Sequence, residues 1–272
     1  MWIYDAVIYI YALSLLCTFS DFLEKNRKMR QLGTGLLVFV WLLQSAFLVL
    51  RLTDGKTPLI ANLFETLFFL SWLLVGGAAF LQSRLKTDLP VLVINLFSFG
   101  ILVLTYVIDP DATPTLSGWE IQDELLFIHI SLAIASYAAF LIAAILSAMY
   151  LFLHNRLKRK KWSQFLKKMP GLGTIDLYAF RFVVLGTPLL IASLILGIVW
   201  VGVTGEYQLL VDPKVLNSLL VLAGYTYYFV QRYTNRAPGF RLAAWNLTAF
   251  AIVVINFVVS NYISGFHQWI WM

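Results

Sequence analysis

The sequence is poor in charged residues. Only 12% of its 272 residues are Asp, Glu, Lys or Arg, whereas a soluble domain averages about 25%. Long polar segments are missing as well, because the longest one runs only from about 155 to 178. A separate soluble domain is therefore excluded.

Cysteine and histidine are also scarce. The chain has one cysteine, Cys17, and three histidines, so it offers neither a disulfide framework nor a cluster of Cys and His with metal-site spacing. It contains no Walker or dinucleotide-binding glycine pattern and no HExxH motif. These absences argue against the nucleotide-dependent and zinc-dependent chemistries that those motifs serve.

Apolar residues are abundant instead, at 60% of the chain, and aromatic residues reach 16%. Eight apolar stretches reach or approach the ~20 residues that cross a bilayer. Backbone in lipid must satisfy its own hydrogen bonds, so each stretch is expected to be a helix. The fold predicted is an all-α polytopic membrane helix bundle with about eight transmembrane helices, in a single integral membrane domain over residues 1–272. The predicted spans are roughly 3–21, 34–52, 61–82, 89–108, 124–152, 181–203, 215–231 and 243–264.

The first stretch, "MWIYDAVIYIYALSLL", carries an acidic residue and no Lys or Arg before its apolar core. The basic residues follow it, in "EKNRKMR". A cleaved signal peptide has the opposite order. This segment is therefore predicted to be a retained helix whose N-terminus lies outside.

The net charge of +6 is concentrated in alternate loops. Four basic residues lie within 25–30, two within 84–86, seven within 156–168 and three within 232–241. The other loops hold only Arg51, Lys56 and Lys214. This asymmetry is the positive-inside pattern, and it predicts both termini on the outer face of the bacterial cytoplasmic membrane rather than a nucleic-acid partner. The run "RLKRKKWSQFLKK" fits an anchor near anionic lipid, and a cytoplasmic docking surface is the alternative.

Two of the three histidines fall on the predicted outer face. His129 enters the fifth helix from outside, and His267 lies just beyond the eighth. Each has an ordinary interpretation, His129 as an interfacial residue and His267 as part of an aromatic belt with Trp269 and Trp271. Neutral imidazole is nonetheless a good axial ligand of haem iron. A two-histidine haem site is therefore a candidate, whereas His154, at the inner end of the fifth helix, is taken as an interfacial residue.

The loop "TGEYQLLVDPK", between the sixth and seventh helices, supplies the other candidate contacts. Trp200 and Tyr207 would offer ring-face contact to a porphyrin, and Lys214 and Arg51 would meet its propionates. Lys214 has the alternative of snorkelling from its helix start. Asp212 is expected to cap the seventh helix.

Four segments, taken in order, resemble the cytochrome c assembly family of haem-handling membrane proteins, and specifically its HemX branch. They are "RLTDGKTPLIANLFETLFFLSW", "HISLAIASYAAFLIAAILSAMYL", "GTPLLIASLILGIVW" followed by "DPK", and "SGFHQW". The family's haem lyases bind haem iron through two external histidines that flank a tryptophan-rich loop. The resemblance therefore implies axial ligation of haem b by His129 and His267.

The chain departs from the lyases in the same region. The stretch before Asp212 reads "EYQLLV", with Tyr207 as its only aromatic residue, and Val215 follows Lys214 where lyases have Glu. The helix after this loop keeps the family's arginine, Arg232, but has Val230 in place of its histidine. These departures favour the HemX branch over an active lyase.

Membership of that branch implies a non-enzymatic, haem-binding regulator of tetrapyrrole synthesis that lowers the level of glutamyl-tRNA reductase. Its cytoplasmic partner would be the reductase or the machinery that degrades it. One alternative is an assembly factor that delivers haem to apocytochrome c at the outer face. Another is a transporter, since acids within the membrane often mark ion paths. Glu65 is the best such acid, although pairing with Arg51 would account for it.

The charge asymmetry predicts that reporter fusions at Lys160 and at Asp111 report opposite compartments. Lys160 belongs to a basic segment and Asp111 to an acidic one, and only the basic segment should stay in the cytoplasm. A paired phosphatase and fluorescent-protein fusion at each site measures this. Matching signals from the two sites would rule out the eight-helix topology.

Overall fold

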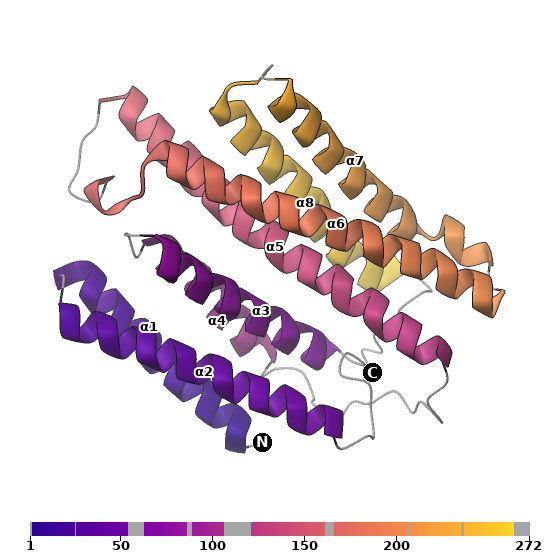
Figure 1. Cartoon of the computed structure of the whole chain (residues 1–272), viewed down its shortest axis with the longest axis horizontal. Coiled ribbons are helices and arrows are strands. Elements are labelled where there is room, and N and C mark those ends of the chain that lie inside the picture. The colour runs from indigo at the N-terminus through magenta and orange to yellow at the C-terminus, as the bar shows by residue number, and fades with distance from the viewer. Residues whose placement is uncertain are drawn as a thin grey trace. The chain divides into compact units, whose positions relative to one another are not determined.

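The computed structural model describes residues 2–24, 26–53, 63–85, 89–105, 121–160, 166–205, 207–234 and 237–263. Within these ranges the regular structure consists of eight α-helices and two short 3-10 helices, without strands (Figure 1). The prediction of an all-α bundle is therefore confirmed. The chain divides into two compact units: unit 1 is Met1–Leu116 with Ser163–Pro170, and unit 2 is Ser117–Trp162 with Gly171–Met272. The single-domain prediction stays a prediction.

Unit 1 holds α1 (Trp2–Glu24), α2 (Arg27–Thr53), α3 (Leu63–Arg84), α4 (Leu89–Leu104) and the 3-10 turn η2 (Leu166–Lys168). Helix α1 packs against α2 and α4, and α3 packs against the same two helices. Buried polar side chains join them, because Ser71 of α3 shares a 3.0 Å hydrogen bond with Ser98 of α4 and accepts one from Gln44 of α2. The turn η2 adds Lys168, whose ammonium donates to the carbonyl of Phe22 near the end of α1.

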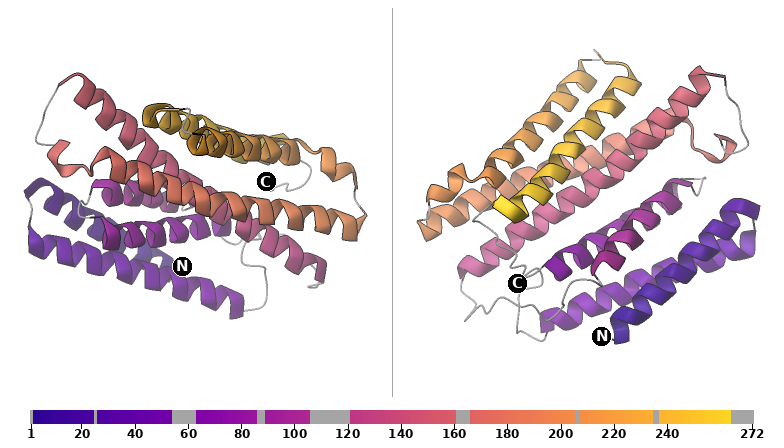
Figure 2. Two further views of the ribbon diagram at one scale, coloured as in Figure 1. Left: turned by 45° about the horizontal axis from the view of Figure 1, so that its top comes forward. Right: turned by 180° about the vertical axis from the view of Figure 1, so that it is seen from behind.

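Unit 2 holds α5 (Ile121–Lys158), α6 (Leu172–Thr204), the 3-10 turn η3 (Tyr207–Val211), α7 (Pro213–Tyr233) and α8 (Gly239–Ile263). Helix α5 packs along α6 and α8, and α7 packs against α8 and, less extensively, α6. Figure 2 shows α7 and α8 side by side in both views. The helices alternate in direction, so the start of α5, the end of α6 and the start of α7 lie at one end of this unit.

In the part of the chain that the structure describes, six helices are long and apolar enough to cross a membrane, namely α1, α2, α3, α5, α6 and α8. A multi-pass membrane protein is therefore consistent with the structure. The described part of α4 is 16 residues long, and α7 carries Lys214, Asn217, Gln231 and Arg232 among its 21 residues. The count of eight spans stays a prediction, as does the outward orientation of the termini.

Two helices extend well beyond their predicted spans. Helix α5 continues to Lys158 instead of ending near 152, and α6 begins at Leu172 instead of near 181. The apolar stretches of the sequence indicate where a helix contacts lipid. A helix can continue beyond the bilayer, however, because Arg, Leu and Lys also have high helix propensity. Arg156 and Lys158 in the last turn of α5 further complement its dipole. The ends of these helices therefore reach into the polar segment between them.

Close packing of α5 on α6 depends on a glycine. A methyl group at Gly186 would lie 2.7 Å from Cε1 of Phe140, and the Phe140 ring is fully buried. On its other side Phe140 stacks on Tyr225 of α7, with ring centroids 3.9 Å apart. The ring is thus held between two helices and has little room to move.

Replacing Gly186 with Ala should destabilise unit 2, because the added methyl overpacks a filled interior, at a cost of about 1–3 kcal/mol. The readout is the melting temperature of the purified protein in detergent. The matched control is Gly202→Ala in the same helix, where an added methyl meets nothing within 4 Å. Equal melting temperatures for the two variants would contradict the packing described for Phe140.

Candidate functional site

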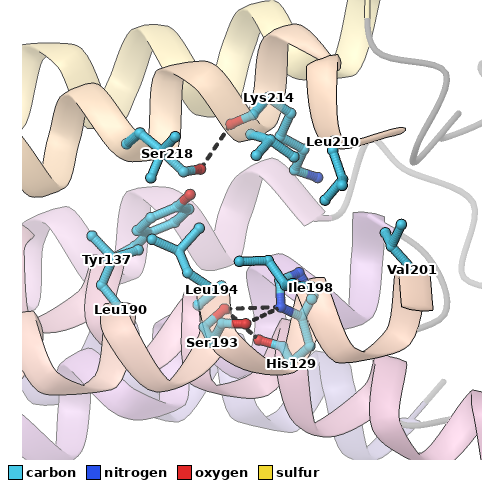
Figure 3. Close-up of a pocket in the computed structure, with 14 residues that line it drawn as sticks. His129, Tyr137, Leu190, Ser193, Leu194, Ile198, Val201, Leu210, Lys214 and Ser218 are labelled. Atoms are coloured by element: carbon cyan, nitrogen blue, oxygen red, sulfur yellow. Dashed lines mark hydrogen bonds between the residues drawn. The ribbon is translucent and has the colours of Figure 1, made fainter. Parts of the chain in front are cut away.

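A cavity of about 220 Å³ lies in unit 2 between α5, α6, η3 and α7 (Figure 3). Its walls are largely aliphatic, with Leu, Ile, Val and Ala side chains from α5, α6, η3 and α7. Five polar or charged residues interrupt this lining, and each is a potential contact for a bound molecule. They are His129, Tyr137, Ser193, Lys214 and Ser218.

His129 stands on the α5 wall, two turns into the helix. Its Nδ1 lies 2.6 Å from the backbone carbonyl oxygen of Ser193 on α6. A carbonyl oxygen only accepts, so Nδ1 carries the hydrogen and, in the neutral ring, Nε2 carries the lone pair. Figure 3 shows Nδ1 turned to Ser193, and among the described residues no hydrogen bond engages Nε2. The ring therefore offers an unused nitrogen donor beside the cavity.

Lys214 lies on the α7 wall, and among the described lining residues it is the one Lys or Arg. Its backbone N–H donates to the Asp212 carboxylate at 2.8 Å, and Pro213 occupies the first helical position. The prediction that Asp212 caps this helix is confirmed. The cap fixes where α7 begins and so places the lysine beside an apolar volume, where an opposite charge interacts more strongly than in water.

A hydroxyl pair lies farther along the cavity. Tyr137 of α5 and Ser218 of α7 both accept hydrogen bonds from the Asn256 amide of α8, at 3.2 and 3.0 Å. Ser218 in turn donates to the carbonyl oxygen of Lys214 at 2.8 Å. Neither Ser218 nor Asn256 was predicted as a site residue, since a lone Ser or Asn within an apolar run gives no sign of its partner.

The remaining predicted contacts do not belong to the described lining of this cavity. Trp200 belongs to α6 and Tyr207 begins η3 with 64% of its surface exposed, and neither lines the cavity. Arg51 belongs to unit 1, where it lies 3.8 Å from Glu65, as the sequence suggested for this pair. His267 lies outside the described residues, so its role stays a prediction.

The other end of unit 2 holds a tight ion pair. Arg232 of α7 donates to both carboxylate oxygens of Asp176 on α6, at 2.9 and 2.8 Å, and lies 4.2 Å from the centroid of the Phe180 ring. The arginine expected from the family resemblance is therefore engaged with a carboxylate. His154 lies between the rings of Tyr150 and Phe240, with centroid distances of 6.2 and 5.4 Å.

The cavity fits part of a haem. One free imidazole nitrogen, one ammonium group and aliphatic walls match the iron, the carboxylates and the ring of a porphyrin. Its volume of about 220 Å³ is below the ~300–1,000 Å³ of sites that enclose a whole small molecule. These residues therefore suit one edge or face of the ligand, and a whole porphyrin would extend beyond them.

Taken together, the fold and the cavity define a polytopic helical membrane protein with a histidine-bearing apolar site. Residues 60–267 match the family model described as cytochrome C assembly protein, and the chain belongs to this family.

Two relatives cover nearly the whole chain. It is 42% identical to the protein named HemX of Brevibacillus brevis over 269 residues, which is 98% of each chain. It is 36% identical to the protein named HemX of Bacillus subtilis over 265 residues, 97% of this chain and 95% of the relative. It is also 25% identical to the cytochrome c biogenesis protein CcsA of Prochlorococcus marinus over 263 residues, 87% of this chain and 79% of the relative. The similarity is thus greater to the HemX proteins than to this CcsA.

Proposed function

We propose that this protein is a haem-binding regulator of the HemX type in the bacterial cytoplasmic membrane, and that it lowers the level of glutamyl-tRNA reductase. Full-length similarity to two proteins named HemX supports this proposal. The regulatory half rests on the resemblance to that branch. The reductase, or the machinery that degrades it, would meet the basic cytoplasmic side, and no catalytic step is assigned to the chain.

The proposal of haem binding rests on one observation: the Nε2 atom of His129 lies beside an apolar cavity that is also lined by Lys214. Haem iron, when bound, supplies a Lewis-acidic centre for a nitrogen lone pair. His129 would donate that lone pair, and Lys214 would neutralise a propionate. The aliphatic walls would exclude water. His267 is proposed as the second axial ligand, and Trp200, Tyr207 and Arg51 as further contacts of a ligand that extends beyond the cavity.

Delivery of haem to apocytochrome c is the second candidate. The similarity to proteins named for cytochrome c biogenesis favours it. Two observations weigh against it. The stretch before Asp212 has Tyr207 as its only aromatic residue, and Val230 stands where the family's lyases have a histidine. The regulator is therefore the better supported function.

The haem half predicts a Soret band when haem b is added to the purified protein, with split visible bands on reduction, as expected for six-coordinate haem b. His129→Ala should convert this spectrum to a five-coordinate one or abolish binding, because the α5 nitrogen donor is lost. Lys214→Ala is the matched comparison, and it should weaken binding while leaving the spectrum unchanged. A wild-type spectrum from His129→Ala would refute the assignment of His129.

The regulatory half predicts that deleting the gene raises the steady-state level of glutamyl-tRNA reductase, and that the wild-type gene restores it. A quantitative immunoblot measures this, with transcript levels as the control for an effect on synthesis. Complementation with the His129→Ala variant then separates haem binding from regulation of the reductase. Restoration by this variant would mean that regulation does not need haem at His129, and an unchanged reductase level on deletion would exclude the regulatory function.

A further inference from the structure

We infer that one turn of α6, from Ser193 to Gly197, is the positioning element of the site: it selects the Nδ1–H tautomer of His129 and holds the ring so that the Nε2 lone pair faces the cavity. The tautomer of His129 is a property of the protein alone. The consequence for iron ligation rests on the proposed function.

Ser193 binds His129 in two ways, and it is itself buried, with 1% of its surface exposed. Its carbonyl oxygen takes the Nδ1–H at 2.6 Å, and its hydroxyl donates to the backbone carbonyl oxygen of His129 at 2.9 Å. The hydroxyl also lies 3.1 Å from Nδ1. The ring and the backbone of one histidine are therefore tied to one residue of the neighbouring helix.

Gly197 makes the carbonyl of Ser193 reachable. Helix carbonyls point toward the C-terminus, so the Ser193 carbonyl faces the turn where residue 197 stands. A ring that approaches this oxygen must cross the position of that residue's side chain. A methyl group there would lie 2.9 Å from Cε1 and 3.1 Å from Nδ1 of His129. The absence of a side chain at Gly197 thus leaves the space that the imidazole occupies.

The arrangement has a chemical consequence. A ligating imidazole that donates its other N–H to a carbonyl has a fixed tautomer and ring orientation and is a more basic ligand. Loss of such support typically costs about 10- to 100-fold in metal affinity. Neither Ser193 nor Gly197 offers a ligand to iron, so their effect on iron ligation should pass through His129. Both also line the cavity, so a direct effect on ligand fit has to be separated from positioning of the ring.

The tautomer can be measured without any ligand. In the full-length protein labelled with ¹⁵N-histidine, in nanodiscs, the His129 signal is assigned by its loss in His129→Gln. We expect a protonated Nδ1 and an unprotonated Nε2 in the wild type. Gly197→Ala should shift the ring to a different or mixed state. A wild-type ring protonated at Nε2 would overturn the inference, whether or not the protein binds haem.

Haem titration tests the consequence. Gly197→Ala should weaken binding by about 10- to 100-fold and alter the iron spectrum. Ser193→Ala keeps the accepting carbonyl and should have a smaller effect. Gly202→Ala is the control, because its added methyl is in open space on the same helix. Unchanged affinity and spectrum in Gly197→Ala would reject positioning by this turn, whereas a wild type that binds no haem would reject the proposed function instead.

Rescue separates positioning from general damage. In His129→Gly, free imidazole should restore the spectrum, since the added ring needs no tether. The double variant with Gly197→Ala should be rescued equally well if Gly197 acts only by placing the tethered ring. Failure of rescue in the double variant alone would show that Gly197→Ala damages the cavity, and this would overturn the inference. If Gly197→Ala does not fold, the wild-type NMR signal and the Ser193→Ala titration still decide the question.

Discussion

Polar side chains within the membrane cannot form hydrogen bonds with water, so their partners come from other helices. This constraint governs both units. In unit 1, Gln44, Ser71 and Ser98 join α2, α3 and α4 through hydroxyl and amide groups that are fully buried. In unit 2, Asn246 of α8 donates to Ser147 of α5 at 2.8 Å. Each such bond fixes the rotation of one helix against the next, which aliphatic packing alone specifies less strictly.

The same constraint distinguishes the two ends of unit 2. At the inner end by the charge pattern, Asp176 and Arg232 satisfy each other with two parallel hydrogen bonds, a geometry that uses both oxygens of the carboxylate. At the opposite end, the His129 ring is hydrogen-bonded to the described residues through Nδ1 alone, and Lys214 borders an aliphatic volume. The cavity that we propose as a binding site lies at this second end of the unit.

Length and apolarity were enough to predict the helices, because lipid leaves the backbone few alternatives. The cap at Asp212 and the pairing of Glu65 with Arg51 were also predictable, since each involves groups that are close in the sequence or share one face. The partner of His129 was not. Ser193 lies 64 residues away, and no local pattern relates two positions at that separation. The polar contacts through Asn256 likewise depend on helix rotation, which periodicity in a uniformly apolar segment does not encode.

Lys214 has separate tasks for its backbone and its side chain. Its N–H is held by Asp212 and its carbonyl by Ser218, so the start of α7 is secured by atoms that every residue except proline possesses. The ammonium group takes no part in either of these two hydrogen bonds. The charge at this wall of the cavity can consequently be changed by substitution at one position. A neutral, cationic or anionic side chain there would leave the backbone hydrogen bonds at the start of α7 in place. A substitution at this position would therefore change the charge offered to a ligand without rebuilding the bundle.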